Sequence, residues 1–273
     1  GPDNPEIIIS DTTIAASSLN TIDAYTTGVV NAATVTTLTG TAADIIHLSI
    51  RPGLEIIGPD NPEIIISDTT ITASSLNTID AYTTGVVNAA TVTTLTGKFT
   101  EIYTVYASNT NATISGLGNE NIIATDALTI AQANTIDAST TGVITATIST
   151  TAIADLDDLT GTGNAYTITV GTADVTAAAL NTVNAATTVN VTATAVTNIT
   201  GSKTELATTF GGGITGLGGE TITVSDANIT STEANTIDAY TTGAVTATIS
   251  TTDITALDDL TGTGNAYTIT VGT

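Results

Sequence analysis

The chain has 273 residues, of which 26 are acidic and three are basic, so its formal net charge is −23. With Lys98, Lys203 and Arg51 as the only cations, it has no basic patch to displace counterions, which excludes nucleic-acid binding and argues against anionic membrane surfaces. Hydrophobic residues make up 41% but aromatic residues only 3%, with no Trp, Met or Cys. This composition favours a narrow core of small and β-branched side chains.

The strongest pattern along the chain is internal repetition. The phrase LNTIDAYTTG begins at residue 19 and returns unchanged at residue 76. Near-copies follow at 133–142, 180–188 and 234–243. The copies divide the chain into five sequence repeats, at residues 1–57, 58–115, 116–172, 173–215 and 216–273.

A shorter period lies inside each sequence repeat. In the first, pairs of one larger and one small residue recur eight positions apart, at Ile22/Ala24, Val30/Ala32 and Leu38/Gly40. Alternation within such a step is typical of a short strand followed by a turn. We therefore predict an all-β fold, a β-solenoid (β-helix) built from the tandem sequence repeats and forming one continuous solenoid.

The segments that join the repeats have a different character. TAADI (41–45), KFTEI (98–102) and SKTEL (202–206) each place an acidic residue close to a helix start signal. We expect these connectors to bulge from the solenoid, each with a single helical turn.

One asparagine recurs in every copy of the repeated phrase. Period-2 alternation places Asn20 on the inner face with Ile22 and Ala24, or at a corner, where its carboxamide can bond the backbone. Asp23 then faces outward, and its counterpart in the fourth copy is Asn184, which cannot act as a general base. We predict a structural turn or ladder role for the asparagines and a turn, surface or calcium-contact role for the aspartate. The asparagines are Asn20, Asn77, Asn134, Asn181 and Asn235.

Two acidic segments are candidate calcium sites. ADLDDLTGTGNAYTI (154–168) and TALDDLTGTGNAYTI (255–269) combine carboxylates with a glycine-rich turn, and calcium prefers oxygen ligands. The alternative is a solvated acidic turn. The candidate ligands are Asp155, Asp157, Asp158, Asp258 and Asp259.

Enzymatic activity is not expected. His47 is the only histidine and Arg51 the only arginine, so histidine-based triads and multi-histidine metal sites are excluded. A polysaccharide-active enzyme and an ice-binding surface are remote alternatives. The second rests on Thr-x-Thr triplets at 145–147, 167–169, 192–194 and 268–270.

Several long phrases resemble the degenerate repeats of very large bacterial surface proteins of cyanobacteria and other aquatic bacteria, and distantly the RTX proteins. They are SDTTIAASSLNTIDAYTTGVVNAATVTTLTGTAADI (10–45), ISGLGNE (114–120) and LDDLTGTGNAYTITVGT (156–172). The resemblance implies secretion and a structural or adhesive role, and it identifies no site residues.

The two ends of the chain repeat internal sequence. Residues 1–10 are identical to 58–67, and TITVGT at 268–273 also stands at 167–172, whereas terminal repeats are usually atypical. We therefore expect a piece of a longer array, or a subunit that stacks head to tail. The predicted function is a secreted structural protein of an extracellular fibre, sheath or adhesin stalk on a bacterial surface. Its expected partners are itself and cell-surface glycans. The alternative is a calcium-dependent binding or adhesion module.

Overall fold

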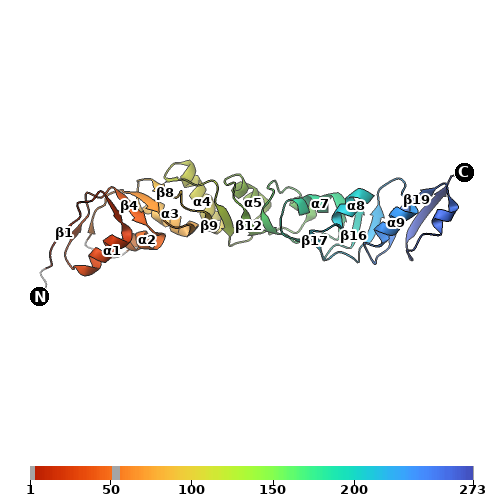
Figure 1. The fold of residues 1–273 in the computed structure, drawn as a ribbon, viewed down its shortest axis with the longest axis horizontal. Coiled ribbons are helices and arrows are strands. Elements are labelled where there is room, and N and C mark those ends of the chain that lie inside the picture. Colours follow the sequence, from red (N-terminus) through yellow and green to blue (C-terminus); the bar gives the residue numbers. More distant parts are fainter. Residues whose placement is uncertain (1–3, 51–55, 273) are drawn as a thin grey trace. The chain divides into compact units, whose positions relative to one another are not determined.

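The computed structural model describes residues 4–50 and 56–272 of the chain (Figure 1). The chain forms two compact units, residues 1–126 with 135–145 (unit 1) and residues 127–134 with 146–273 (unit 2). Among the cations discussed above, Arg51 lies outside the described residues.

The fold is mixed α/β, so the prediction of an all-β β-solenoid is wrong. Helices separate small groups of strands along the chain, and neighbouring strands pair in parallel. Parallel neighbours need a long crossover connection. Here those connections contain helices, in segments where the sequence predicts strands or single turns.

The repeated phrase forms helices. In the second copy, Ala73, Leu76 and Ile79 are buried and stand three positions apart, which is the spacing of one helix face. The alternation of Ile22 and Ala24 is therefore not the period that decides burial, because both residues lie inside a helix. The helices of this type are α1 Ala16–Tyr25, α3 Ala73–Tyr82, α5 Ile130–Asp137, α7 Ala177–Ala185 and α9 Ser231–Asp238.

The connectors form longer helices than the predicted single turns. Glu205 stabilises one of them through a capping box, in which its carboxylate accepts from the Ser202 amide at 2.8 Å and the Ser202 hydroxyl accepts from the Glu205 amide at 3.3 Å. These helices are α2 Ala42–Ile50, α4 Phe99–Thr110 and α8 Lys203–Thr209. Two shorter ones are α6 Ile153–Leu156 and the 3₁₀ helix η1 Ile254–Leu257.

Unit 1 contains three parallel sheets. Their orders are β1-β3-β5, β10-β8-β6-β4-β2 and, within this unit, β7-β9-β11-β12. The strands are β1 Ile7–Ile8, β2 Thr13–Ala15, β3 Val30–Asn31, β4 Thr37–Gly40, β5 Ile56–Ile57, β6 Glu63–Ile66, β7 Thr70–Thr72, β8 Val87–Asn88, β9 Thr94–Gly97, β10 Ile114–Ser115, β11 Asn121–Ala124 and β12 Ile144–Thr147, which extends into unit 2.

Unit 2 contains a five-stranded sheet in the order β14-β16-β18-β19-β20 and a pair β15-β17, and β13 belongs to the sheet of β12. The strands are β13 Ala165–Thr167, β14 Asp174–Thr176, β15 Val191–Thr192, β16 Asn198–Gly201, β17 Ile214–Thr215, β18 Thr221–Val224, β19 Val245–Thr251 and β20 Ala266–Val271.

Strand pairing reveals a structural repeat about half as long as the sequence repeat. In unit 1, Ile14 pairs with Leu38, and Leu38 pairs in turn with Ile64. In unit 2, Ile199 pairs with Ile222 in the same way. These paired apolar side chains are stacked and fill the core, since Leu38, Ile64 and Ile222 are fully buried. Each structural repeat adds strand and helix to those before it.

None of the helices in the described part of the chain is long and apolar enough to cross a membrane.

Candidate functional site

The five recurring asparagines lie on helices, and each one bonds to the structural repeat that follows its helix. Each carboxamide nitrogen donates to a backbone carbonyl of the following structural repeat, always at the same separation along the chain. Such bonds give each carboxamide a backbone partner in the neighbouring structural repeat and so link the two repeats. The pairs are Asn20 with Asp44 (3.0 Å), Asn77 with Glu101 (3.0 Å), Asn134 with Asp158 (2.9 Å), Asn181 with Glu205 (3.0 Å) and Asn235 with Asp259 (2.6 Å).

The carboxamide oxygen of the asparagine also has a partner in four of the five copies. In the first copy the partner is His47, whose Nδ1 lies 2.9 Å from the Asn20 Oδ1. In the fourth it is the Thr209 hydroxyl, at 2.9 Å from the Asn181 Oδ1. In the third and fifth, backbone amides of Thr160 and Thr261 donate to it. His47, the only histidine, thus takes part in a contact between repeats.

The Asn77 oxygen is the exception. It is buried, and no residue that the structure describes bonds to it. Val105 occupies the same position relative to Asn77 as Thr209 does relative to Asn181, and valine has no hydroxyl. The second copy therefore leaves a buried acceptor without a donor, which is a cost to stability.

The threonines that end the repeated phrase form a second set of contacts between repeats. The first threonine of each TT pair donates its hydroxyl to a carbonyl of the preceding structural repeat and accepts from the amide of the second residue after it. The accepting carbonyls and distances are Pro5 for Thr26 (3.4 Å), Pro62 for Thr83 (2.7 Å), Glu120 for Thr140 (2.8 Å), Tyr166 for Thr187 (2.8 Å) and Glu220 for Thr241 (2.6 Å).

In the four copies that end in TTG, the glycine is required because two backbone segments approach closely. A Cβ at Gly28 would lie 2.6 Å from the Pro5 carbonyl oxygen, and one at Gly142 would clash with the Glu120 carbonyl. Only a residue without a side chain fits such a contact. The fourth copy has Val189 at this position, with a side chain 40% exposed.

Two glutamates are fully buried, and the sequence alone does not identify them. Glu120 is 0% exposed and Glu220 2% exposed. The Glu120 carboxylate accepts from the amides of Gly118 (2.8 Å) and Asn119 (3.1 Å) and from the Tyr106 hydroxyl, all within unit 1. Burial, together with the bond to Glu120, raises the pKa of Tyr106 above its usual value. The phenol therefore stays protonated and donates.

Glu220 binds its own turn in the same way, since the Gly218 amide lies 2.8 Å from its Oε1 and 2.9 Å from its Oε2. The signal in the sequence is an acidic residue that follows a glycine-rich turn and directly precedes an apolar strand.

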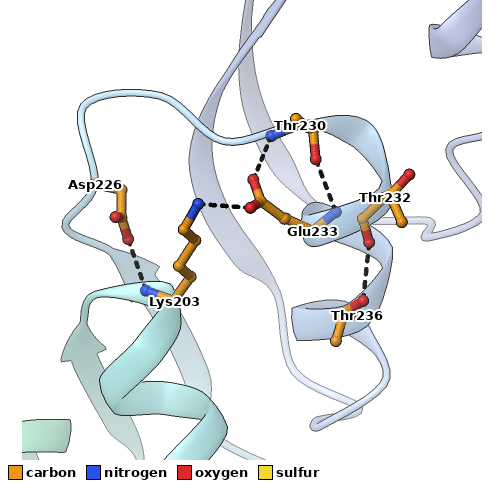
Figure 2. Close-up of polar contacts among 6 residues, drawn as sticks. All are labelled: Lys203, Asp226, Thr230, Thr232, Glu233 and Thr236. Carbon is orange, nitrogen blue, oxygen red and sulfur yellow. Dashed lines mark hydrogen bonds and ion pairs between the residues drawn. The ribbon is translucent and has the colours of Figure 1, made fainter.

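Aspartates of one structural repeat cap helices of the preceding one. The Asp226 carboxylate accepts from the Lys203 amide at 2.6 Å, at the N-terminus of α8 (Figure 2). Asp68 and Asp126 do the same for Ala42 in α2 and Phe99 in α4, at 2.7 and 2.9 Å. A carboxylate at a helix N-terminus satisfies an unpaired amide and interacts favourably with the helix dipole.

Lys203 also forms an ion pair between α8 and α9. Its Nζ lies 2.5 Å from the Glu233 Oε1, and the other Glu233 oxygen accepts from the Thr230 amide at 2.8 Å (Figure 2). The bond to Glu233 raises the pKa of Lys203, and the bonds from Lys203 and Thr230 lower the pKa of Glu233. Because both side chains are partly exposed, water and salt screen the pair.

The predicted calcium ligands are exposed or have other contacts. Asp155 accepts from the Thr150 hydroxyl at 3.2 Å, and the carbonyls of Asp158 and Asp259 are the acceptors for Asn134 and Asn235. Asp157 and Asp258 lie at the C-terminal ends of α6 and η1. Within the described ranges, no three acidic or histidine side chains are grouped so that they could hold a metal ion. Calcium binding stays a prediction.

One hollow near these aspartates is shallow. It has a volume of about 450 Å³ and is lined in part by Asn134, Thr150, Asp155 and Asp158. It contains hydroxyls, an amide and carboxylates, but among the residues that the structure describes it has no cation or histidine to pair with them.

Comparisons with protein-family models, with curated proteins and with solved structures gave no match for this chain.

Proposed function

We propose that this chain is a structural part of a secreted bacterial surface fibre, sheath or adhesin stalk. The proposal rests on the contacts that the repeated phrase makes. Its asparagine, first threonine and glycine all make contacts with a neighbouring structural repeat, in both units. The asparagine and the first threonine, which recur in all five copies, thus hold repeats together, as expected of an array of structural repeats.

The polar chemistry supports the same proposal. The buried carboxylates of Glu120 and Glu220 are engaged by backbone amides of their own turns. The single histidine bonds Asn20. The net charge of −23 keeps such an array soluble and repels other polyanions. A role in binding cell-surface glycans or calcium would use the exposed acidic turns near Asp155 and Asp258.

Two measurements test the proposal. Electron microscopy of the purified protein with and without EDTA should show end-to-end assemblies that are indifferent to the chelator. Discrete single particles in both conditions would contradict the structural role, and assemblies lost on chelation would favour the calcium-dependent module instead. In intact source cells, external protease should digest the protein, whereas a protected protein would refute surface display.

A further inference from the structure

A hollow in unit 1 lies beside the C-terminal half of α4. It has a volume of about 290 Å³ and is lined by two tyrosines, a carboxamide and two hydroxyl-bearing side chains. None of the described residues that line it is charged, although the whole chain has a net charge of −23. The hollow therefore suits a neutral ligand. Its lining residues are Tyr103, Tyr106, Ala107, Thr110, Asn111 and Ser139.

An aromatic ring fills the equivalent place in unit 2. Tyr106 is equivalent to Phe210, and both follow the same helix start. Ser139 is equivalent to Tyr240, whose ring stacks on that of Phe210 with centroids 4.9 Å apart and an angle of 9° between the planes. Serine has no ring, so unit 1 has a hollow where unit 2 has the Tyr240 ring. The equivalent segments are KFTEIYTVY (98–106) and SKTELATTF (202–210), and ANTIDAST (133–140) and ANTIDAYT (234–241).

A longer helix supplies another wall of the hollow. Helix α4 has 12 residues, whereas the equivalent α8 has seven and ends at Thr209. Ala107, Thr110 and Asn111 belong to the additional turn of α4 or directly follow it. Two differences between the units thus meet at one place, the absence of a ring that would fill the hollow and the presence of a helical turn that bounds it. The hollow has room for about one six-membered ring.

The polar groups around the hollow can bond a ligand. The Thr110 and Ser139 hydroxyls each donate to a backbone carbonyl four residues earlier, at 2.9 and 3.0 Å, and keep their lone pairs as acceptors. Within residues 4–50 and 56–272, no hydrogen bond engages the Asn111 carboxamide or the Tyr103 hydroxyl. Both groups can donate and accept. The hollow thus offers donors and acceptors without a formal charge.

We propose that this hollow binds one pyranose ring of a neutral saccharide. A pyranose has an apolar C–H face that packs on an aromatic ring and a rim of hydroxyls that donate and accept. Tyr103 offers such a ring, since it is 54% exposed and stacks on Phe99 with centroids 5.7 Å apart. The volume lies near the lower limit of small-molecule sites, about 300 Å³, which fits a single ring.

The surroundings of the hollow favour this class of ligand over two others. An anionic sugar is repelled by the net charge of −23. A purely apolar ring would cover the polar groups of Asn111 and Ser139 without bonding to them, which costs free energy. The inference goes beyond the proposed structural function and does not require that the chain assembles.

NMR titration of the full chain tests the site with three neutral probes, methyl β-glucoside, methyl β-galactoside and N-acetylglucosamine. We expect the amide signals of α4 and of residues around Ser139 to shift with at least one of them, with a Kd of about 1 mM, because a single ring makes few contacts. Glucuronate, a similar ring with a carboxylate, should bind several-fold more weakly than methyl β-glucoside. The absence of shifts with all three neutral probes would overturn the inference, and so would shifts confined to other parts of the chain.

Substitutions on two sides of the hollow give an independent measure. Ser139→Tyr supplies the ring that Tyr240 supplies in unit 2, and it should abolish binding. Tyr103→Ala should weaken binding about tenfold or more, since it removes the stacking surface. The matched control is Tyr25→Ala, because Tyr25 is 85% exposed and does not line the hollow. Full binding by Ser139→Tyr, or equal effects of the two tyrosine substitutions, would refute the site. The amide spectrum of each variant reports its fold, and the exposed position of Tyr103 makes that variant a test that does not depend on repacking.

Phenol is the competing probe, because the ring of Tyr240 in unit 2 is a phenol. If phenol shifts the same amide signals and the three saccharides do not, the hollow takes aromatic groups and the saccharide assignment fails. The proposed structural function is tested separately by electron microscopy. End-to-end assemblies without saccharide binding would leave that function standing and remove this site, whereas binding by single particles would do the reverse.

Discussion

The asparagine contact between repeats is weaker in the second copy of the phrase than in the fourth, because the second copy leaves a buried acceptor without a donor. The Asn77 Oδ1 is buried and unbonded within the described residues, whereas the Asn181 Oδ1 accepts from the Thr209 hydroxyl at 2.9 Å. Val105 stands where Thr209 stands in the fourth copy. We predict that Val105→Thr stabilises the protein, because the new hydroxyl donates to Asn77.

The size of the expected stabilisation follows from the free-energy cost of an unsatisfied buried polar group. An unpaired buried polar atom costs about 1–3 kcal/mol, and a new buried hydroxyl is costly unless it is bonded. The Glu205 carbonyl, one helical turn earlier, lies 3.0 Å from the Thr209 hydroxyl and is a second acceptor for its single proton. Glu101 occupies the same position relative to Val105. We therefore expect Val105→Thr to raise the free energy of unfolding by about 1 kcal/mol. The reverse change, Thr209→Val, should lower it by about 1–2 kcal/mol.

Amide hydrogen exchange is the suitable assay, since a chain with two compact units need not unfold in one step. Protection should increase in α3 and α4 for Val105→Thr and decrease in α7 and α8 for Thr209→Val. Thr208→Val is the control, because that exposed threonine donates only within its own helix, to the Thr204 carbonyl. If Val105→Thr reduces protection, or if Thr208→Val costs as much as Thr209→Val, the reasoning is wrong.

Three further predictions concern other contacts. Tyr106→Phe removes a hydrogen-bond donor from the buried Glu120 carboxylate and should lower the free energy of unfolding by about 1–3 kcal/mol, measured by urea unfolding. The control Tyr103→Phe, at an exposed residue, should change it little. No loss of stability in Tyr106→Phe would contradict the role of that bond. Gly142→Ala should cost several kcal/mol because its Cβ meets the Glu120 carbonyl, whereas Gly219→Ala, with open space around it, should change the melting temperature little. The pKa of Glu233 is lowered in the folded protein, so the contribution of its carboxylate to the free energy of unfolding is present above the pKa of the unfolded state. That contribution is lost as the pH falls through the lower pKa of the folded state. Lys203→Gln should raise the pKa of Glu233, which NMR titration measures. An unchanged pKa would show that the ion pair does not cause the shift.

From the sequence we predicted repeats and short strands, but we assigned the repeated phrase to a strand whereas it forms a helix. Ile22 and Ala24 alternate as in a strand, yet Leu76 and Ile79 in the identical second copy are spaced as in a helix. Short apolar patterns do not distinguish the two periods. Abundant threonine and asparagine have modest helix propensity, so packing against neighbouring helices decides the outcome. Tertiary contacts therefore overrode local preference.

The contacts between repeats were hidden because the structural repeat is half the sequence repeat. The asparagines recur once in each sequence repeat, whereas their bonding partners lie in the structural repeat between two copies, in segments of different sequence. A signal was nevertheless present, since every asparagine is followed at one fixed separation by an acidic residue, as Asn20 is by Asp44. The buried glutamates could not be distinguished from surface acids, because their burial depends on glycine turns and, for Glu120, on Tyr106.

Two alternating kinds of structural repeat also fix which neighbours can pair. Helices α1, α3, α5, α7 and α9 carry the asparagine. Helices α2, α4 and α8, each of which follows one of them, are capped by Asp68, Asp126 and Asp226 from the next repeat. A slip by one structural repeat would bring two asparagine helices together and leave these caps without their targets. Such a slip is therefore penalised, as register errors are in designed sheets. A shift by a whole sequence repeat would instead keep the bond from the asparagine to a backbone carbonyl, which recurs in all five copies.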